Sequence, residues 1–157
     1  MFSSLATAKA AKILTKAAGA DLYEIKPAVP YNRADLNWMD QKSRSTLEMN
    51  DPACRPAIAA PAADLDQYDT VFVGFPIWWY VEPRIVDTFL ERSDFSGKTV
   101  IPFVTHGGGG MARCADEVRK LCPKSTVLKG GAFAGEGIRT TRAALVKWVN
   151  ETISINK

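Results

Sequence analysis

Aromatic side chains follow an apolar run in the middle of the chain. Residues 71–76 are mostly β-branched or aromatic and end in proline, and Trp78, Trp79 and Tyr80 come directly after them. A short run bounded by turn residues is typical of a strand buried on both faces in a parallel sheet. The rings would then lie at the carboxyl end of that strand, where open α/β sheets bind ligands. They suit a flat ligand, although packing under the next helix would explain both tryptophans equally well.

Four consecutive glycines, residues 107–110, follow the next apolar run at residues 99–105. A backbone without Cβ atoms can approach a ligand very closely. A merely flexible turn is the alternative, but four glycines would be entropically costly for that purpose, so we favour a binding loop. His106, just before them, could hydrogen-bond to a ligand with an imidazole able to titrate near neutral pH. It could equally face water.

Hydroxyl side chains gather where the first helical pattern begins. Ser3, Ser4 and Thr7 lie at or before the start of a helix that is predicted to end at Gly19. N-capping alone would explain one of these hydroxyls. The free N–H groups and the positive end of the helix dipole would also favour a phosphate at this place.

Strand and helix patterns alternate along the chain and must position these three loops. Strands are predicted at residues 21–26, 71–75, 99–105 and 125–128, with residues 130–135 extending the last strand or turning from it. Helices are predicted up to residue 18, from about 31 toward 48, from Pro83, over 111–121, and after a cap at Thr140 or Thr141. Residues 51–63 are predicted to be a connecting loop. The alternation predicts an α/β fold, a three-layer, doubly wound parallel sheet in a single domain over residues 1–157.

Composition excludes several classes of function. The net charge of +3 is mild and the basic residues are scattered among acids, so no nucleic-acid footprint is expected. No apolar run approaches the ~20 residues that span a bilayer. Lysines interrupt the amino-terminal segment, which therefore does not resemble a signal peptide.

The number and spacing of cysteine and histidine residues favour a reducing compartment and argue against a metal site in the protein. The three cysteines, Cys54, Cys114 and Cys122, form no C-x-x-C pair, so a disulfide framework or zinc site is not expected. A single histidine also argues against a catalytic metal. We expect a cytoplasmic protein.

Together the three loops resemble those of the flavodoxin family, specifically the flavodoxin-like proteins with Gly-Phe-Pro-Ile-Trp-Trp after the third strand. That motif stands here at residues 74–79, and residues 83–90 also resemble the family pattern. The resemblance extends over residues 2–148. It implies FMN as the cofactor. It points to no particular catalytic residue and to no metal ligand.

The resemblance also implies how FMN would be held. The phosphate would meet Ser3, the backbone of residues 4–8 and the Thr7 hydroxyl. The isoalloxazine ring would lie against residues 76–80, with Trp78 or Trp79 nearest, and residues 105–109 would offer N–H groups to its pyrimidine edge. The implied cofactor-binding residues are Ser3, Ser4, Leu5, Ala6, Thr7, Ala8, Pro76, Ile77, Trp78, Trp79, Tyr80, Thr105, His106, Gly107, Gly108 and Gly109.

The amino-terminal part departs from the family in two ways. The family's first loop usually reads Ser-x-Thr-Gly-x-Thr, whereas this chain has Leu5, Ala6 and Ala8 around Thr7, so two hydroxyls and the glycine are lost. The family also places a complete strand before this loop, where this sequence has only Met1 and Phe2. Either the sequence is truncated at its start or the sheet lacks its usual first strand. A missing central strand would leave strand edges unpaired, which favours pairing of two copies or instability.

FMN would make the chain a redox protein of one of two kinds. It could carry single electrons to a partner protein, or it could take hydride from NAD(P)H and reduce a quinone or similar small acceptor. No second nucleotide motif is visible, which favours the carrier, while the net charge of +3 favours the reductase because carrier flavodoxins are usually acidic. The alternative is a degenerate flavodoxin-like domain that holds no cofactor and acts in protein interaction.

Overall fold

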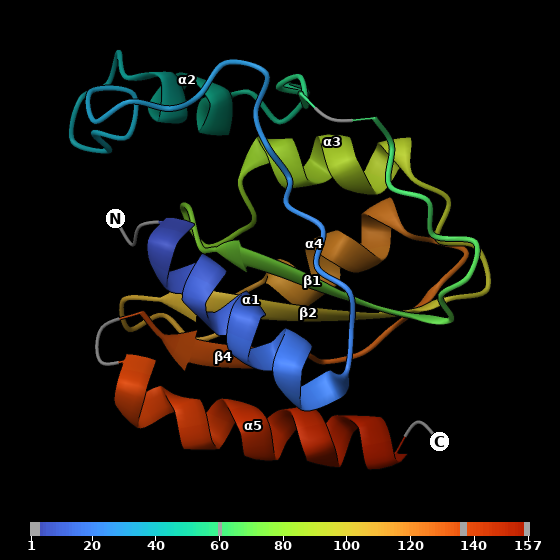
Figure 1. Ribbon diagram of the computed structural model, residues 1–157. Helices are drawn as coiled ribbons and strands as arrows, with labels where there is room; N and C mark the ends of the chain where they lie inside the picture. The colour runs from blue at the N-terminus through green and yellow to red at the C-terminus, as the bar shows by residue number, and fades with distance from the viewer. Residues whose placement is uncertain (1–3, 60, 136–137, 156–157) are drawn as a thin grey trace.

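The fold is a parallel sheet between two layers of helices. The computed structural model describes residues 4–59, 61–135 and 138–155. Figure 1 shows α1 and α5 on one face of the sheet and α3 and α4 on the other, with α2 set apart. The elements are α1 (Ser4–Ala18), α2 (Arg44–Asn50), β1 (Thr70–Pro76), α3 (Arg84–Arg92), β2 (Thr99–His106), α4 (Cys114–Leu121), β3 (Thr126–Val127), β4 (Gly131–Ala134) and α5 (Ile138–Ile155). This is the three-layer, doubly wound arrangement that the strand–helix alternation predicted.

Strand β2 is the centre of the described sheet. On one side it pairs in parallel with all of β1, from Thr70↔Thr99 to Pro76↔Thr105. On its other side it pairs first with β3 and then with β4, so these two short strands form one interrupted strand. The interruption lies at Gly130, whose φ of +79° and close approach to the Pro102 carbonyl exclude a side chain. Residues 130–135 therefore extend the preceding strand.

Two apolar cores cover the two faces of the sheet. Val73 and Phe75 of β1 pack with α3 and α4 in one core, where the predicted face of Ile85, Val86, Phe89 and Leu90 is buried. The other core lies between the sheet, α1 and α5. Its buried members are Ala10, Leu14, Phe103, Phe133, Leu145 and Val149.

The predicted cap of the last helix is wrong, since α5 already begins at Ile138, ahead of Thr140 and Thr141.

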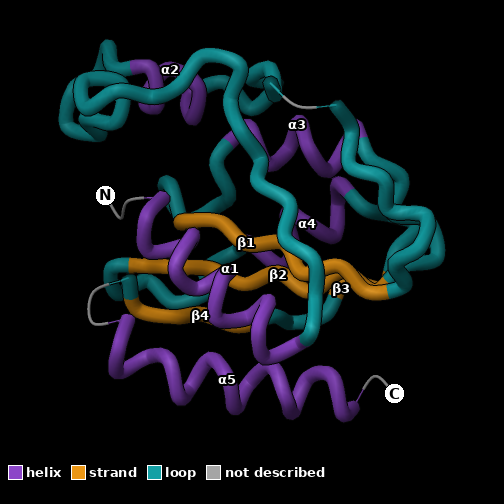
Figure 2. Tube along the Cα trace, in the orientation of Figure 1, coloured by secondary structure: helices purple, strands orange, loops and turns teal. Residues whose placement is uncertain are grey.

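The strand predicted at residues 21–26 does not form. This segment has no ladder partner in the described part of the chain, and the nearest pairing is an isolated bridge between Pro27 and Ile58. Figure 2 shows it as a loop that runs from the end of α1 toward α2. Its side chains contact the α3 side instead, where the Tyr23 ring stacks on Phe89 at 5.6 Å. The sequence pattern is strand-like, but a strand needs a neighbouring backbone to pair with.

The helix predicted from about residue 31 begins only at Arg44. The preceding residues form a series of turns in which Asn and Asp side chains accept hydrogen bonds from the backbone two or three residues ahead. Such local bonds compete with helix formation. The helix α2 starts where Ser43 caps it by accepting a hydrogen bond from the Thr46 N–H.

Candidate functional site

Three segments far apart in the sequence meet at one edge of the sheet, and we call this edge the rim. The first turn of α1 and the carboxyl ends of β1, β2 and β4 all lie on the left in Figure 1. Thr105, which is fully buried, joins them: its Oγ1 lies 2.7 Å from Thr7 Oγ1, and its carbonyl accepts the Ile77 N–H at 3.0 Å. The predicted loops are therefore gathered in one place.

The segment after β1 is a tight hairpin turn. Trp78 and Val81 exchange two backbone hydrogen bonds of 2.9 and 3.1 Å, and Trp79 and Tyr80 between them have φ of 46° and 70°. A two-residue turn with both φ positive usually contains Asn or Gly, because a side chain is strained in this region. Two bulky residues here cost on the order of 1–3 kcal/mol each. Strain of this kind is concentrated at functional sites.

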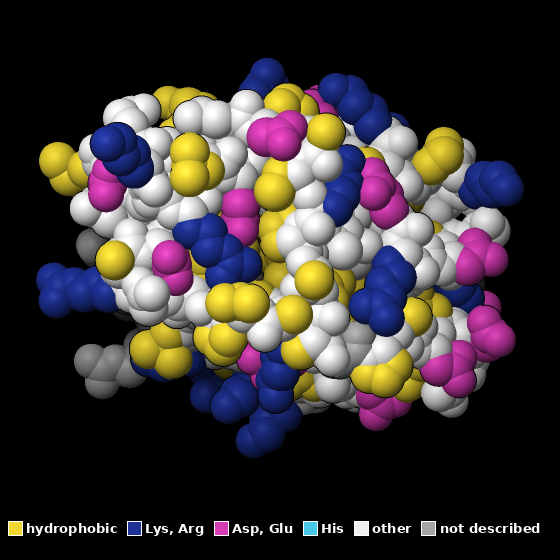
Figure 3. Space-filling model, turned by 90° about the horizontal axis from the view of Figure 1, so that it is seen from above, with side chains coloured by type: hydrophobic (Ala, Val, Ile, Leu, Met, Phe, Trp, Pro, Cys, Tyr) yellow, Lys and Arg dark blue, Asp and Glu magenta, His cyan; other side chains and the backbone are white. Residues whose placement is uncertain are grey.

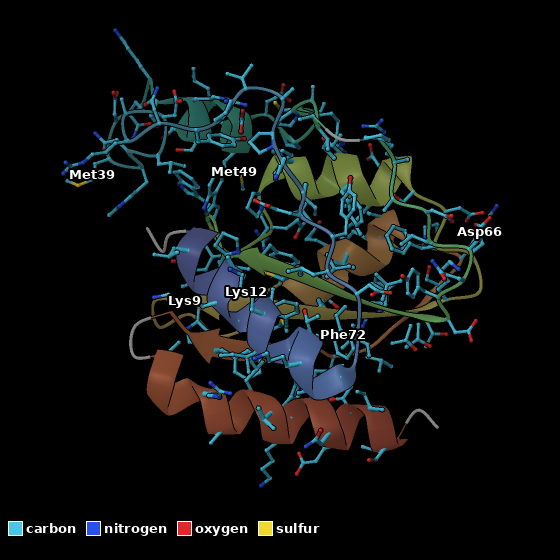
Figure 4. All side chains as sticks on the ribbon, in the orientation of Figure 1. Lys9, Lys12, Met39, Met49, Asp66 and Phe72 are labelled. Atoms are coloured by element: carbon cyan, nitrogen blue, oxygen red, sulfur yellow. The ribbon has the colours of Figure 1, made fainter. Side chains whose placement is uncertain are left out.

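The turn is fixed from two sides. On one side, Trp78 and Val81 pack on Met49 of α2, and Figure 4 shows Met49 between α2 and the turn. Beyond it, the Arg113 N–H donates to the Tyr80 carbonyl at 3.3 Å, which ties the turn to the end of the glycine loop.

The two tryptophans have different roles in this turn. Trp78 is 7% exposed, and its ring contacts the Tyr31 ring edge-on with ring centres 5.6 Å apart. For Trp78, therefore, packing in the core explains the aromatic side chain. Trp79 and Tyr80 are 36% and 68% exposed. A ligand at the rim can therefore reach Trp79 and Tyr80, whereas Trp78 packs under α2 and anchors the turn.

The glycine loop presents open backbone. A Cβ placed on Gly108, Gly109 or Gly110 would meet nothing within 4 Å. The His106 side chain is used within the loop, because its Nδ1 accepts the Gly108 N–H at 2.9 Å. The imidazole thus shapes the loop, and Gly107 and Gly109 lie exposed beside it.

The amino-terminal segment, expected to be a loop, is helical from Ser4 onward. Ser3 lies outside the described residues. Only the first-turn N–H groups lack partners within a helix, so Ala8 cannot offer its N–H as predicted. Leu5 is exposed, Ala6 and Thr7 are buried, and the Thr7 hydroxyl is already bonded to Thr105. Figure 4 shows Lys9 and Lys12 on this half of α1.

A pair of buried carboxyl groups lies behind the turn. Glu82 and Asp87 are 1% and 2% exposed and lie close enough for each carboxyl to affect the pKa of the other. Burial raises the pKa of Glu82 to about 8. Burial also raises the pKa of Asp87, although the positive charges of Arg84 and Arg55 lower it in part. One oxygen of each carboxyl has no hydrogen-bond partner among the described residues. Sequence reasoning missed this pair, because no spacing pattern marks Glu82.

An apolar groove opens beside the rim. It has a volume of about 1450 Å³ and lies between α1, residues 22–38, the carboxyl end of β1 and the start of α3. It shares Thr7, Ala8, Pro76 and Trp78 with the predicted cofactor site. Its remaining lining includes the aromatic residues Tyr23, Tyr31 and Trp38.

Other kinds of site find no support in the described part of the chain. The described residues contain no group of His, Cys, Asp or Glu side chains able to hold a metal ion, and no described helix is long and apolar enough to cross a membrane. All three cysteines are free thiols. On the face seen in Figure 3, basic and acidic side chains are interspersed with apolar ones, so that face offers no basic tract to a nucleic acid.

Comparison with known proteins gives a consistent result. A family model described as flavodoxin matches residues 1–152. A solved structure of a candidate flavoprotein from Bacteroides uniformis is 42% identical with a TM-score of 0.85, and the match covers 92% of this chain and 90% of that one. A second, from Bacteroides eggerthii, is 42% identical with a TM-score of 0.84 and covers 96% and 91%. A comparison with curated proteins gave no match.

Proposed function

The chain belongs to the flavodoxin family, and from this premise we propose that it binds FMN at the rim and acts as a redox protein. The observation that carries the proposal is the junction at Thr105, which brings together the first turn of α1, the strained aromatic turn and the glycine loop. These are the segments that the family resemblance assigned to phosphate, ring face and ring edge. When bound, FMN would supply the electron or hydride transfer itself.

The residues at the rim fit this cofactor in three respects. Trp79 and Tyr80 offer exposed aromatic surface against which a flat ring can stack. The open glycines allow backbone N–H groups to approach the ring edge. In the first turn of α1 the N–H groups have no acceptor within the helix, the dipole end is positive, and no residue is acidic. The chain's own residues thus bind and orient the cofactor.

A specific observation also favours the cofactor-free alternative. The Thr7 hydroxyl, assigned to the phosphate, is engaged by Thr105, and residues 5–8 are helical rather than a loop that wraps an anion. A degenerate flavodoxin-like domain acting in protein interaction is therefore the second candidate.

Substitution of the exposed turn separates the two candidates. We expect Trp79→Ala to weaken FMN binding by on the order of ten- to a hundredfold, as the loss of an aromatic stack does. Met39→Ala removes another exposed apolar side chain, one that lies outside the groove beside the rim, and should leave FMN affinity unchanged. Equal affinities in both variants and the parent chain, measured by calorimetry, would contradict the proposed site.

Reduction kinetics separate the two redox roles. The partner is either a redox protein or NAD(P)H together with a small acceptor such as a quinone. Fast anaerobic reduction of the FMN-loaded chain by NADPH alone, monitored by stopped-flow spectroscopy, excludes a pure electron carrier.

The free thiols of the three cysteines support a cytoplasmic location.

A further inference from the structure

His106 lies where β2 ends and the glycine loop, residues 107–110, begins. Its backbone is fixed in the sheet, because it pairs with Ala134 and its carbonyl accepts the Gly135 N–H at 2.9 Å. Its half-buried side chain reaches into the loop, where Nδ1 accepts the Gly108 N–H at 2.9 Å. We propose that His106 is a positioning residue that holds the glycine loop closed for the flavin only while its imidazole is neutral.

The direction of this hydrogen bond fixes the protonation state of the imidazole. A backbone N–H can only donate, so Nδ1 must present its lone pair to Gly108. The neutral ring then carries its proton on Nε2. In the imidazolium form both ring nitrogens carry a proton, and Nδ1 would face the Gly108 N–H as a second donor. Protonation of His106 therefore removes the bond.

Little else holds this stretch of the loop. Within the described residues, Gly108 is the one glycine of residues 107–110 whose N–H has an acceptor. Its φ of +133° is rarely adopted by residues with a side chain, and glycine loses more conformational freedom on ordering than any other residue. The far end of the loop is fixed where the Arg113 N–H donates to the Tyr80 carbonyl. Closure of the near end thus depends on His106, while the remaining glycine N–H groups stay available to a ligand.

The imidazole has no charged partner among the described residues, since the bond to Gly108 is its one recorded interaction there. Titratable side chains on the elements that meet at the rim are Lys9 and Lys12 on α1, Tyr80 in the turn, Glu82 behind it, Arg113 at the loop end, and Cys114, Asp116 and Glu117 in α4. All of these groups are unchanged when His106 alone is substituted. A pH effect that disappears with His106 therefore belongs to the imidazole.

The inference deepens the proposed function and rests on it for the identity of the ligand. An open loop must close again before its N–H groups can meet the edge of a flavin ring, which lowers the apparent affinity by the closed fraction. FMN should therefore bind more weakly at pH 5.5 than at pH 8. The FMN phosphate also titrates in this range, so the parent chain must be compared with a variant at both pH values.

His106→Asn is the matched variant for this comparison. An Asn side chain accepts the N–H two residues ahead in an Asx turn and does not titrate, whereas His106→Ala removes the acceptor. In calorimetric titration with FMN, the affinity should fall roughly three- to tenfold more between pH 8 and pH 5.5 in the parent chain than in His106→Asn. At pH 8, His106→Ala should bind FMN roughly three- to tenfold more weakly than His106→Asn.

The loop itself can be followed by NMR without FMN. The chain has one histidine and 11 glycines, so the imidazole signals of a tag-free sample belong to His106 and a glycine-labelled spectrum is simple. One glycine amide signal should shift together with the His106 ring signals between pH 5.5 and 8. This shift should be absent from His106→Asn.

Each outcome of these experiments decides the inference. It is overturned if the parent chain and His106→Asn show the same change of FMN affinity with pH, if a folded His106→Ala binds FMN as tightly as His106→Asn at pH 8, or if no glycine amide follows the ring. His106→Asn and the amide signal keep the test valid even where His106→Ala fails to fold. An amide that follows the ring in a chain that binds no FMN supports the role of His106 in the loop and counts against the proposed function alone.

Discussion

Tyr80 combines an exposed side chain with a backbone conformation that favours glycine. Its φ of 70° lies at the second central position of the turn, where Gly is preferred. Because its ring is 68% exposed, little packing is lost when it is removed. Ligand binding, rather than stability of the free chain, accounts best for an aromatic residue here.

Two substitutions of Tyr80 separate backbone strain from ring contact. Tyr80→Gly should stabilise the FMN-free chain by about 0.5–1 kcal/mol, because it removes the strain of a Cβ at positive φ. Tyr80→Ala keeps the Cβ and should bring no such gain. Both should weaken FMN binding. Urea denaturation and FMN titration check these results, and a destabilised glycine variant would show that the turn is not strained.

The Glu82–Asp87 pair should make stability depend on pH. The pKa of Glu82 is raised by burial from 4.5 to about 8, so between these values the folded chain keeps a proton that the unfolded chain has lost. The free energy of unfolding should therefore fall as pH rises from about 5 to 8. Glu82→Gln should flatten this slope, as measured by urea denaturation at several pH values.

Glu91→Gln is the control for this pH dependence. Arg55 lowers the pKa of Glu91 by a hydrogen bond, so its contribution to stability is lost only in acid, below the window of Glu82. The slope between pH 5 and 8 should survive in this variant. A parent slope that Glu82→Gln does not change would assign the pH dependence to other groups.

Helix α1 is attached to the sheet at the rim by one buried hydroxyl pair. Thr105→Val leaves the Thr7 hydroxyl buried without its partner, which should cost about 1–3 kcal/mol in free energy of unfolding. The double variant Thr7→Val/Thr105→Val leaves neither hydroxyl unpaired and should lose less than the sum of the single variants. Simple additivity in urea denaturation would contradict a direct bond between the two side chains.

Elements were predictable where local pattern and environment agree. The apolar runs at residues 71–75 and 99–105 predicted β1 and β2, and helical spacing after Pro83 predicted the buried face of α3. Residues 21–26 have a strand pattern, but pairing depends on a neighbour that the pattern does not contain. Residues 33–42 failed as a helix because Asn and Asp side chains bind their own backbone there.

The site was predictable as segments but not as individual contacts. The three loops stood out by residue type, and the parallel sheet brings their ends together. Which tryptophan is exposed depends on how Met49 and Tyr31 pack against the turn, and both come from distant parts of the chain. The bond from Thr7 to Thr105 likewise joins residues 98 positions apart.

At the scale of the whole molecule, the rim and the groove lie side by side at one corner of the sheet. Strand β1 pairs with β2 alone within the described ranges, and the groove runs along the carboxyl end of β1. The predicted pairing of two copies through such an edge stays a prediction.

Titration of the FMN-free chain with FMN tests the proposed function most directly. We expect FMN fluorescence to be quenched to a clear end point at one FMN per chain, and the freshly purified protein to be yellow. Circular dichroism should confirm in the same sample that the chain is folded. A folded, colourless chain that leaves the fluorescence of added FMN unchanged would contradict a flavin site at the rim.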